Sequence, residues 1–353
     1  MRDFFKTVLK ENELGIKPDW DKIFGRKGPL YLEIGIGNGE FIVWLAQNKP
    51  EANFIGVEVS REYFRKAVNR AINAKLANLR LICIEGAKAL SKLFDSETLA
   101  GLYLNFPDPW AKKSQKERRL VNPAFIWLLG DRLVLEGFFI MVTDYEPYAK
   151  EVLEHFLKCP VFEPLWDTPL KMNLTEYYHT KYARKWLSMG LSLFYIGFKK
   201  VKRVELPEWI SKFYPLIKLK KEEPLPLNIL KLGKSVTLKE FLKFFSKDVI
   251  WKKGEELIKI LDIYFKEDGI LLDTLVVEGL LKQRFFISIN PYDKDGVIIS
   301  IHDSDHPDPT DGVHKALVLI TLKIQEKFPQ AKLIQSNCKI KAFREIKKEK
   351  GLE

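Results

Sequence analysis

Between residues 29 and 200, short apolar runs alternate with longer stretches whose apolar residues recur at a helical period. Five runs rich in β-branched or aromatic residues are strand candidates, namely PLYLEIGIG, NFIGVEVS, LRLICIEG, GLYLNFPD and GFFIMVTD. The stretches GEFIVWLAQNK, SREYFRKAVNRAINAKLA and NPAFIWLLGDRLV between them are helix candidates. This alternation predicts an α/β fold with a doubly wound, mostly parallel sheet, whose ligands bind at the carboxyl ends of the strands.

The rest of the chain has a different pattern. We take residues 1–28 as an N-terminal segment, 29–200 as the α/β domain, and the charged, proline-containing residues 201–235 as a linker. Residues 236–353 contain four further strand candidates, EELIKILDIYFKED, GILLDTLVVEG, LLKQRFFISINPYDKDG and VIISIHDSD. The stretch TDGVHKALVLITLKIQEKF then predicts a helix capped by Thr or Asp. We therefore expect a smaller α+β domain after the linker.

Composition excludes some classes of protein. No run of about 18 uncharged apolar residues is present, so we expect no membrane span. The first residues carry acids and no small-residue cleavage site, which argues against a secretory signal. The cysteines are odd in number and far apart, which predicts reduced, buried thiols in a cytoplasmic protein without a zinc site. The net charge of +11 fits a polyanionic partner, but it is spread over both halves, so local clusters must decide.

The stretch YLEIGIGNGEF combines a strand, a Gly-rich turn and the start of a helix. Gly35, Gly37 and Gly39 allow the backbone to approach a ligand closely, and amides at the helix start can face it. A dinucleotide site would require a further Gly where this chain has Glu40, so dehydrogenase activity is disfavoured. Glu33, just before the turn, can face a cationic amino group. These features favour S-adenosylmethionine, which carries an ammonium and a sulfonium but no pyrophosphate.

Two more acids end the next two predicted strands. Glu58 is placed to accept hydrogen bonds from both ribose hydroxyls, and Glu85 to meet the adenine edge. The alternative is that Glu33, Glu58 and Glu85 are ordinary strand-end acids in solvent. Three acids at successive strand ends, together with the turn, favour the cofactor.

The stretch NFPDPW places Asp108 after the fourth predicted strand, on the same side as the cofactor turn. Pro107 and Pro109 lack backbone donors and restrict two φ angles, so the turn that carries Asp108 is stiff. Trp110 offers a flat face on which a base can stack. The carboxylate can accept hydrogen bonds from guanine and favours positive charge that develops on an alkylated ring. The alternative is a structural turn with an exposed acid.

A block of positive charge follows this turn. It contains Lys112, Lys113, Lys116, Arg118 and Arg119, against the single acid Glu117. Such a block is often only a solvated surface, but phosphate contacts are what position a protein on nucleic acid. Beside a predicted base pocket, the block predicts binding of an RNA backbone.

Five stretches in this order and spacing resemble the tRNA (guanine-N7-)-methyltransferase family, of the bacterial type with an added C-terminal domain: LEIGIGNGEF, NFIGVEVS, LYLNFPDPWAKKSQKERRL, TDYEPYA and TKYARKW. The resemblance covers roughly residues 29–200, and FPDPW with its basic run is its most specific part. It implies a class I, Rossmann-like methyltransferase fold. It also implies transfer of a methyl group from S-adenosylmethionine to N7 of the tRNA variable-loop guanine conventionally numbered 46.

The resemblance also implies roles for individual residues. Asp108 would be catalytic and would line the cofactor site together with Glu33, Gly35, Gly37, Glu58 and Glu85. Substrate would be bound by Lys112, Asp144, Thr180, Lys181, Tyr182 and Ala183. RNA would be contacted by Lys113, Ser114, Gln115, Lys116, Glu117, Arg118 and Arg119.

Three positions depart from the family pattern. Ala183 stands where the family usually has Glu, Gln115 where a His is common, and Ala111 where another residue is usual. These departures concern the positioning of guanine more than binding of the cofactor. They leave open an RNA-binding protein on an inactive methyltransferase fold, or a methyltransferase that acts on another nucleobase.

Further expectations concern a second possible motif, metal binding and the C-terminal domain. Asn105-Phe106-Pro107 has a faint similarity to the motif of amino methyltransferases, but Phe106 and Asp108 stand at positions that this motif gives to other residues. The segment IHDSDHPDPTDGVH is rich in His and Asp but lacks a recognised ligand spacing, so we expect no metal. The C-terminal domain is basic, and we expect it to bind RNA, with a stabilising or dimerising module as the alternative. The sequence leaves the oligomeric state open.

Overall fold

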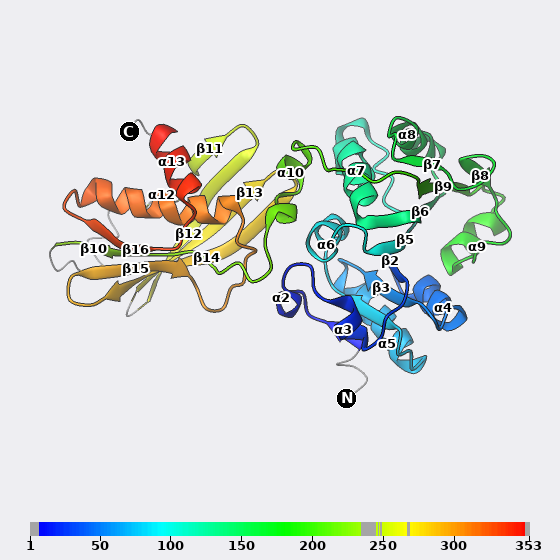
Figure 1. The fold of residues 1–353 in the computed structure, drawn as a ribbon, viewed down its shortest axis with the longest axis horizontal. Helices are drawn as coiled ribbons and strands as arrows, with labels where there is room; N and C mark the ends of the chain where they lie inside the picture. The colour runs from blue at the N-terminus through cyan, green and yellow to red at the C-terminus, as the bar shows by residue number, and fades with distance from the viewer. Residues whose placement is uncertain (1–6, 234–244, 246, 248, 267–268, 350–353) are drawn as a thin grey trace. The chain divides into compact units, whose positions relative to one another are not determined.

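The computed structural model describes residues 7–233, 245, 247, 249–266 and 269–349 of the 353-residue chain. The chain divides into two compact units, Met1–Ile210 and Ser211–Glu353. Each unit contains its own sheet (Figure 1).

The first unit is built on a mostly parallel sheet. Its strands run in the order β1-β4-β3-β2-β5-β6-β9-β7, and β8 pairs with β9. Figure 1 shows β6, β5, β2 and β3 following one another across the sheet. The strands are β1 (Val8–Leu9), β2 (Leu30–Ile34), β3 (Asn53–Val57), β4 (Leu79–Ile82), β5 (Leu99–Asn105), β6 (Leu133–Thr143), β7 (Phe162–Pro164), β8 (Leu170–Met172) and β9 (Phe194–Lys200). Strands β1 to β6 pair in parallel and β9 runs antiparallel to β6, so the predicted doubly wound sheet is confirmed.

Helices connect these strands and cover both faces of the sheet. They are α2 (Glu11–Leu14), α3 (Trp20–Phe24), α4 (Glu40–Asn48), α5 (Arg61–Asn73), α6 (Gly86–Lys92), α7 (Pro123–Arg132), α8 (Glu146–Leu157) and α9 (Lys181–Ser188), with the 3₁₀ helix η1 (Lys113–Arg118). Strand residues alternate between the faces: Tyr103 packs with α4 and α5, whereas its neighbours Leu102 and Leu104 point to the opposite face and are buried there. Side-chain caps at Ser60 and Asn122 begin α5 and α7 where the sequence predicts them.

The direction of the strands brings the predicted site residues to one edge of this sheet. Because β2 to β6 are parallel, their carboxyl ends meet at the same edge. The Gly-rich turn follows β2, Glu58 follows β3, Glu85 follows β4, Asp108 follows β5 and Asp144 follows β6. Strand β2 lies between β3 and β5, so the chain changes direction across the sheet at this point, where α/β folds bind their ligands.

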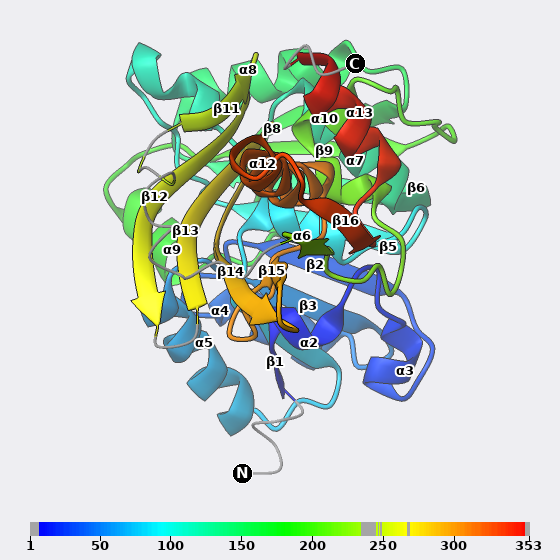
Figure 2. The same ribbon diagram turned by 90° about the vertical axis from the view of Figure 1, so that its left-hand side faces the viewer.

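The second unit is an antiparallel sheet with helices on one face. The strand order is β11-β12-β13-β14-β15-β10-β16, and Figure 2 shows α12 lying across this sheet. The strands are β10 (Leu227–Lys231), β11 (Val249–Lys253), β12 (Glu256–Lys266), β13 (Gly269–Glu278), β14 (Leu281–Tyr292), β15 (Gly296–Ile301) and β16 (Lys332–Ser336). The helices are α10 (Ile210–Phe213), η2 (Pro215–Lys218), α12 (Asp311–Lys327) and α13 (Ile340–Glu349). Residues of the sheet and of α12 and α13 share one apolar core.

The segment predicted as a linker, 201–235, differs from the expectation. Its residues 227–231 form β10, which pairs with β15 and β16 inside the second sheet. Along the chain, the boundary between the two compact units falls between Ile210 and Ser211. Residues 234–235 lie outside the described part of the chain. The prolines and charges nearby are typical of a linker and not of a strand. The strand forms by pairing with β15 and β16, which come about 70 and 100 residues later in the sequence.

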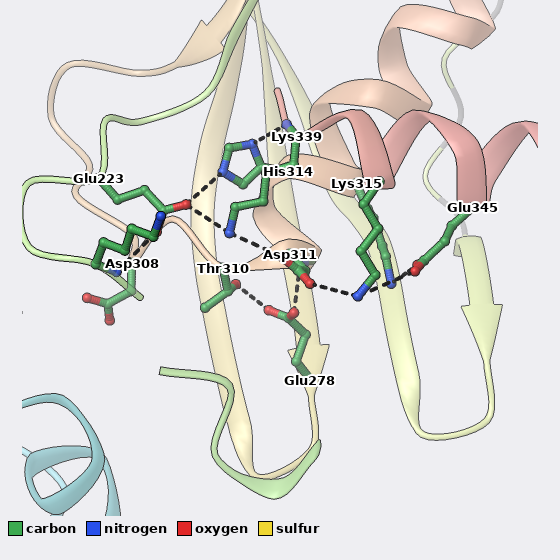
Figure 3. A network of polar contacts seen from close by, with 12 residues as sticks. Glu223, Glu278, Asp308, Thr310, Asp311, His314, Lys315, Lys339 and Glu345 are labelled. Atoms are coloured by element: carbon green, nitrogen blue, oxygen red, sulfur yellow. Dashed lines mark hydrogen bonds and ion pairs between the residues drawn. The ribbon is translucent and has the colours of Figure 1, made fainter. Parts of the chain in front are cut away.

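A polar network surrounds the N-terminus of α12 (Figure 3). The buried Glu278 carboxylate accepts hydrogen bonds from the Thr310 hydroxyl and from the Gly312 amide, the latter at 2.6 Å. Lys339 pairs with Glu223 and Asp311, and Lys315 with Glu256 and Glu345. The residues therefore cap α12 and join it to α13 and the sheet.

The sequence also led us to expect no membrane span, no metal site and reduced cysteines. In the described ranges, no helix combines the length and apolar character that a membrane span needs. No three His, Cys, Asp or Glu side chains in those ranges gather as a metal site requires. In the segment rich in His and Asp, Asp305 accepts a hydrogen bond from the Phe286 amide, so it supports a turn. The cysteines are free; Cys159 and Cys338 are buried, but Cys83 is only half-buried.

Candidate active site

The Gly-rich turn between β2 and α4 forms an open backbone cradle. Gly35 and Gly37 have φ angles of +73° and +53°, and a Cβ at either position would meet no atom within 4 Å. Gly39 differs, because a Cβ there would lie 2.9 Å from Ala67 of α5. Gly35 and Gly37 thus leave room for a ligand, whereas Gly39 allows α4 to pack closely on α5.

Glu33 is a buried acid at the floor of this turn. The residue is 2% exposed, and its Oε1 accepts a hydrogen bond from Asn105 Nδ2 at 3.0 Å. Its Oε2 is buried without a hydrogen-bond partner. Burial, reinforced by the nearby charge of Glu58, raises the pKa of Glu33 to about 8, although the bond from Asn105 acts against this. A buried acceptor without a partner is suited to a cationic group on a ligand.

Glu58 and Glu85 both bind backbone amides. Glu58 accepts from the amides of Gly37 (2.9 Å) and Ser60 (2.8 Å), which fixes its carboxylate against the Gly-rich turn. Glu85 accepts from the amides of Ala87 and Lys88 and is the N-cap of α6. Its oxygens therefore have a capping function that the sequence analysis did not assign, and contact with adenine stays a prediction.

The turn with Asp108 has an unusual backbone. Phe106 and Trp110, on either side of the Pro-Asp-Pro stretch, both have positive φ angles, +52° and +41°. Such conformations are costly for large side chains and cluster at functional sites. Asp108 is exposed at the tip of this turn. The Arg118 guanidinium lies 5.1 Å from the centre of the Trp110 ring, so a base could stack on that face only after Arg118 moves.

The basic block that follows is mostly exposed, with one exception. Lys112 is exposed just before η1, and Lys113, Lys116 and Arg118 are exposed within it. Arg119 is 3% exposed: it binds Glu151 at 2.6 Å, donates to the Pro109 carbonyl and lies over the Tyr148 ring. The predicted contact of Arg119 with RNA therefore needs correction, because its buried side chain instead supports the turn that carries Asp108.

Residues 177–184 lie against α4, beside the Gly-rich turn. Tyr178 stacks on Trp44 and Tyr177 on Phe41, with ring centres 4.7 and 5.1 Å apart. Tyr177 Oη donates to Asn105 Oδ1 at 2.9 Å. The segment of Thr180, Lys181, Tyr182 and Ala183 begins α9, and Thr180 is its N-cap.

The structure therefore brings together most of the predicted residues. Tyr182 packs edge-to-face on Phe106 at 4.9 Å, which joins α9 to the turn with Asp108. Sequence analysis missed Asn105 and Tyr177, which connect Glu33 to the segment before α9, and the contacts of Glu40 with that segment. Asn105 stands in the NFPDPW motif, which was a usable signal; Tyr177 gave none.

The residues present fit S-adenosylmethionine. Glu33 offers a buried oxygen for an ammonium, Gly35 and Gly37 leave open space in the turn after β2, and Glu58 stands at the end of the next strand. The amides of Gly35, Ile36 and Gly37 donate to Val57 and Glu58, so this turn offers a ligand room and not free donors. This arrangement would hold the methionine part at β2 and the ribose at β3. Pyrophosphate would meet the two acids Glu33 and Glu58 and is therefore disfavoured.

Comparison with known proteins agrees with this geometry. A family model described as "Putative methyltransferase" matches residues 27–196. The tRNA (guanine-N(7)-)-methyltransferase of Thermotoga maritima is 33% identical over 69% of this chain and 77% of its own length. That of Thermus thermophilus is 34% identical over 67% and 75%, and that of Syntrophotalea carbinolica 34% over 54% and 83%. The first match covers 243 residues, more than the first unit contains, so it extends into the second.

Proposed function

Since the chain belongs to the tRNA (guanine-N7-)-methyltransferase family, we propose that it methylates the guanine conventionally numbered 46 in the variable loop of tRNA. The enzyme uses S-adenosylmethionine and acts on N7 of guanine. The observation that carries the proposal is the convergence of Glu33, the open Gly turn and Asp108 at one edge of the sheet. A tRNA substrate also supports the cytoplasmic location expected from the sequence.

The reaction makes limited chemical demands on the protein. When bound, S-adenosylmethionine supplies a methyl group on a positively charged sulfur. Guanine N7 has a free lone pair, so no base must remove a proton from the nucleophile. The chain's own residues have to position the two reactants and favour the positive charge that appears on the guanine ring. Asp108 is the residue that we assign to this second task, because it is a carboxylate at the carboxyl end of β5, next to the cofactor turn.

Access to the base is the second requirement. In folded RNA the N7 edge lies in a deep, narrow groove that side chains cannot read, so the guanine must be exposed or flipped out. Trp110 and Tyr182 flank the turn with Asp108, and the Tyr182 side chain is 46% exposed. We assign these rings to stacking of the guanine, with Lys112, Asp144, Thr180 and Lys181 around it.

One experiment tests the proposal directly. Purified protein is incubated with methyl-labelled S-adenosylmethionine and an unmodified tRNA transcript, and the nucleosides are then separated. We expect labelled N7-methylguanosine, and none from a transcript in which adenine replaces guanine 46. Label in another nucleoside would favour a different base as the substrate. Binding of tRNA without any label would favour an inactive, RNA-binding protein.

The basic block gives a second prediction. If Lys112, Lys113, Lys116 and Arg118 meet phosphates, replacing all four by Gln lowers the slope of log affinity against log salt by about 3, at roughly 0.7–0.9 per contact. Titrations of tRNA that determine Kd at several salt concentrations measure this slope. Replacement of Lys150 and Lys158, exposed on and just after α8, is the control. An unchanged slope would make the block a solvated surface.

We further propose that the second unit is an auxiliary RNA-binding domain. The residues assigned to methyl transfer all lie in the first unit, so the second has no assigned chemistry. Helix α13 exposes Arg344, Lys347 and Lys348. Other cations of this unit are engaged in ion pairs: Arg284 with Asp273, Lys339 with Glu223 and Asp311, and Lys341 with Asp311 and Glu345. Lys332 is exposed.

Truncation after Ile210 tests that role. A second contact surface on the same RNA raises the effective concentration of tRNA at the active site without touching the base. The shortened protein should bind S-adenosylmethionine normally but show roughly a tenfold or larger increase in KM for tRNA. Steady-state kinetics and calorimetry measure these two quantities. An unchanged KM with a lower Tm would instead assign the second unit a stabilising role. If the full-length protein is a dimer in solution and the shortened protein is a monomer, the second unit has a dimerising role.

A further inference from the structure

Glu40 is the first residue of α4, one position after the Gly-rich turn, and its side chain binds residues outside its own helix. Its Oε1 accepts hydrogen bonds from Tyr178 Oη at 3.1 Å and from Arg184 Nη2 at 2.8 Å. Its Oε2 accepts from the Lys181 backbone amide at 2.8 Å. All three donors are about 140 residues away in the sequence; Tyr178 lies just before α9, and Lys181 and Arg184 lie in its first turn. The Glu40 carboxylate therefore joins the cofactor turn to the N-terminus of α9.

The charge state of Glu40 suits this contact. Its side chain is only 13% exposed, whereas that of Arg184 is 54% exposed. Partial burial by itself would raise the pKa of Glu40, but the hydrogen bonds from Lys181, Arg184 and Tyr178 lower it below its usual value. The residue is thus a carboxylate at neutral pH, placed at the positive end of the α9 helix dipole.

Helix α9 is short, and Ala183, Trp186 and Leu187 attach it to the apolar core. It has eight residues, of which Ala183 is buried, while Lys181, Tyr182 and Arg184 are exposed. Helices of this length depend on tertiary contacts, because their own hydrogen bonds are too few. At its N-terminus the helix is held by the Thr180 cap, by the contacts with Glu40, and by the packing of Tyr182 on Phe106 and of Tyr178 on Trp44.

We propose that Glu40 is a positioning residue, which sets the place of Thr180–Ala183 beside the cofactor turn so that the guanine of tRNA meets the methyl group in the right geometry. The proposal rests on the proposed function. It assigns to Glu40 a carboxylate contact at the start of α9. Helix α9 does not supply a carboxylate of its own at position 183, where this chain has an alanine. Loss of such a contact misplaces the substrate segment and leaves the buried core unchanged.

The test compares Glu40→Gln with the wild type, with Glu62→Gln as the matched control. Glu62 also lies in the first turn of a helix and pairs with a cation, Lys66 at 2.6 Å, but its side chain is 75% exposed. Hydrogen exchange of the amides in 180–188 reports on positioning, calorimetry on cofactor affinity, and steady-state kinetics on tRNA. For Glu40→Gln we expect faster exchange in this segment, cofactor Kd within about twofold, and KM for tRNA raised roughly tenfold, as loss of a charged hydrogen bond implies.

A partner variant identifies the interaction. Arg184→Gln should raise KM for tRNA less than Glu40→Gln does. The double variant Glu40→Gln/Arg184→Gln should raise KM less than the two single effects combined, because either single change already breaks the interaction between the two side chains. Fully additive effects would contradict the pairing.

The outcomes separate the two proposals. Unchanged exchange in 180–188 overturns the positioning role of Glu40, whatever the enzyme methylates. Faster exchange with an unchanged KM for tRNA overturns its link to the substrate. Equal losses in Tm, cofactor affinity and kcat would make Glu40 a residue of general stability and also overturn the proposal. If the wild type forms no N7-methylguanosine, the proposed function fails, while hydrogen exchange still decides the positioning role.

Discussion

Replacing Asp108 by Asn is expected to lower kcat by a factor of about one hundred, as loss of one preorganised electrostatic group in an active site does. Asn keeps the shape and one acceptor but removes the negative charge. That charge interacts most strongly with the ring when the methyl group has been partly transferred and N7 has become positive, so the transition state loses more than the bound substrate. Single-turnover kinetics with saturating cofactor and tRNA measure this step.

Affinity measurements complete this prediction. The Kd for tRNA and for S-adenosylmethionine should change by less than about threefold, because Asp108 is exposed at the tip of its turn and Asn preserves its size. Asp167→Asn is the matched control, since Asp167 is an exposed aspartate whose side chain pairs with Lys171. Near-normal turnover of Asp108→Asn would refute the charge-stabilising role. A large loss of tRNA affinity would make Asp108 a binding residue instead.

Local pattern was enough to predict the five central strands of the first unit. Strands β2 to β6 coincide with the five apolar runs, because a strand buried on both faces must be apolar over its whole length. The parallel order then places residues at the strand ends on one edge, so Glu33, Glu58, Glu85, Asp108 and Asp144 could be grouped without any knowledge of distances.

Contacts between distant segments could not be predicted in this way. Arg119 looks the same in the sequence as its neighbour Arg118, and only the nearby Glu151 on α8 and the Pro109 carbonyl show that it is buried. Glu40 was interpreted only as a position that lacks a glycine, whereas its hydrogen-bond donors lie in and just before α9, about 140 residues later. Strand β10 escaped detection for the same reason, since its partners follow it by many residues.

The pH dependence of cofactor affinity is the second large effect that we expect, and Glu33 causes it. The pKa of this buried acid is about 8, so at pH 6 nearly all free protein carries a proton on Glu33. An ammonium requires the carboxylate, and binding must release this proton. Affinity for S-adenosylmethionine should therefore be roughly tenfold or more lower at pH 6 than at pH 8, by linkage. Above about pH 8 the rise ends, because the amino group of the cofactor itself loses its proton.

Glu33→Gln removes the titrating group and nearly preserves its shape. Its affinity should be low at both pH values and lack the rise between them, which calorimetry in two buffers measures. The unliganded protein provides an independent check. The folded-state pKa lies above the usual 4.5, so the native state holds a proton that the unfolded chain releases, and stability falls as the pH rises from about 4.5 to 8. Relative to Glu33→Gln, the wild-type Tm should decline over this interval. Parallel Tm curves for the two proteins would show that Glu33 is ionised in the free enzyme, and the predicted fall in affinity at pH 6 would then lose its cause.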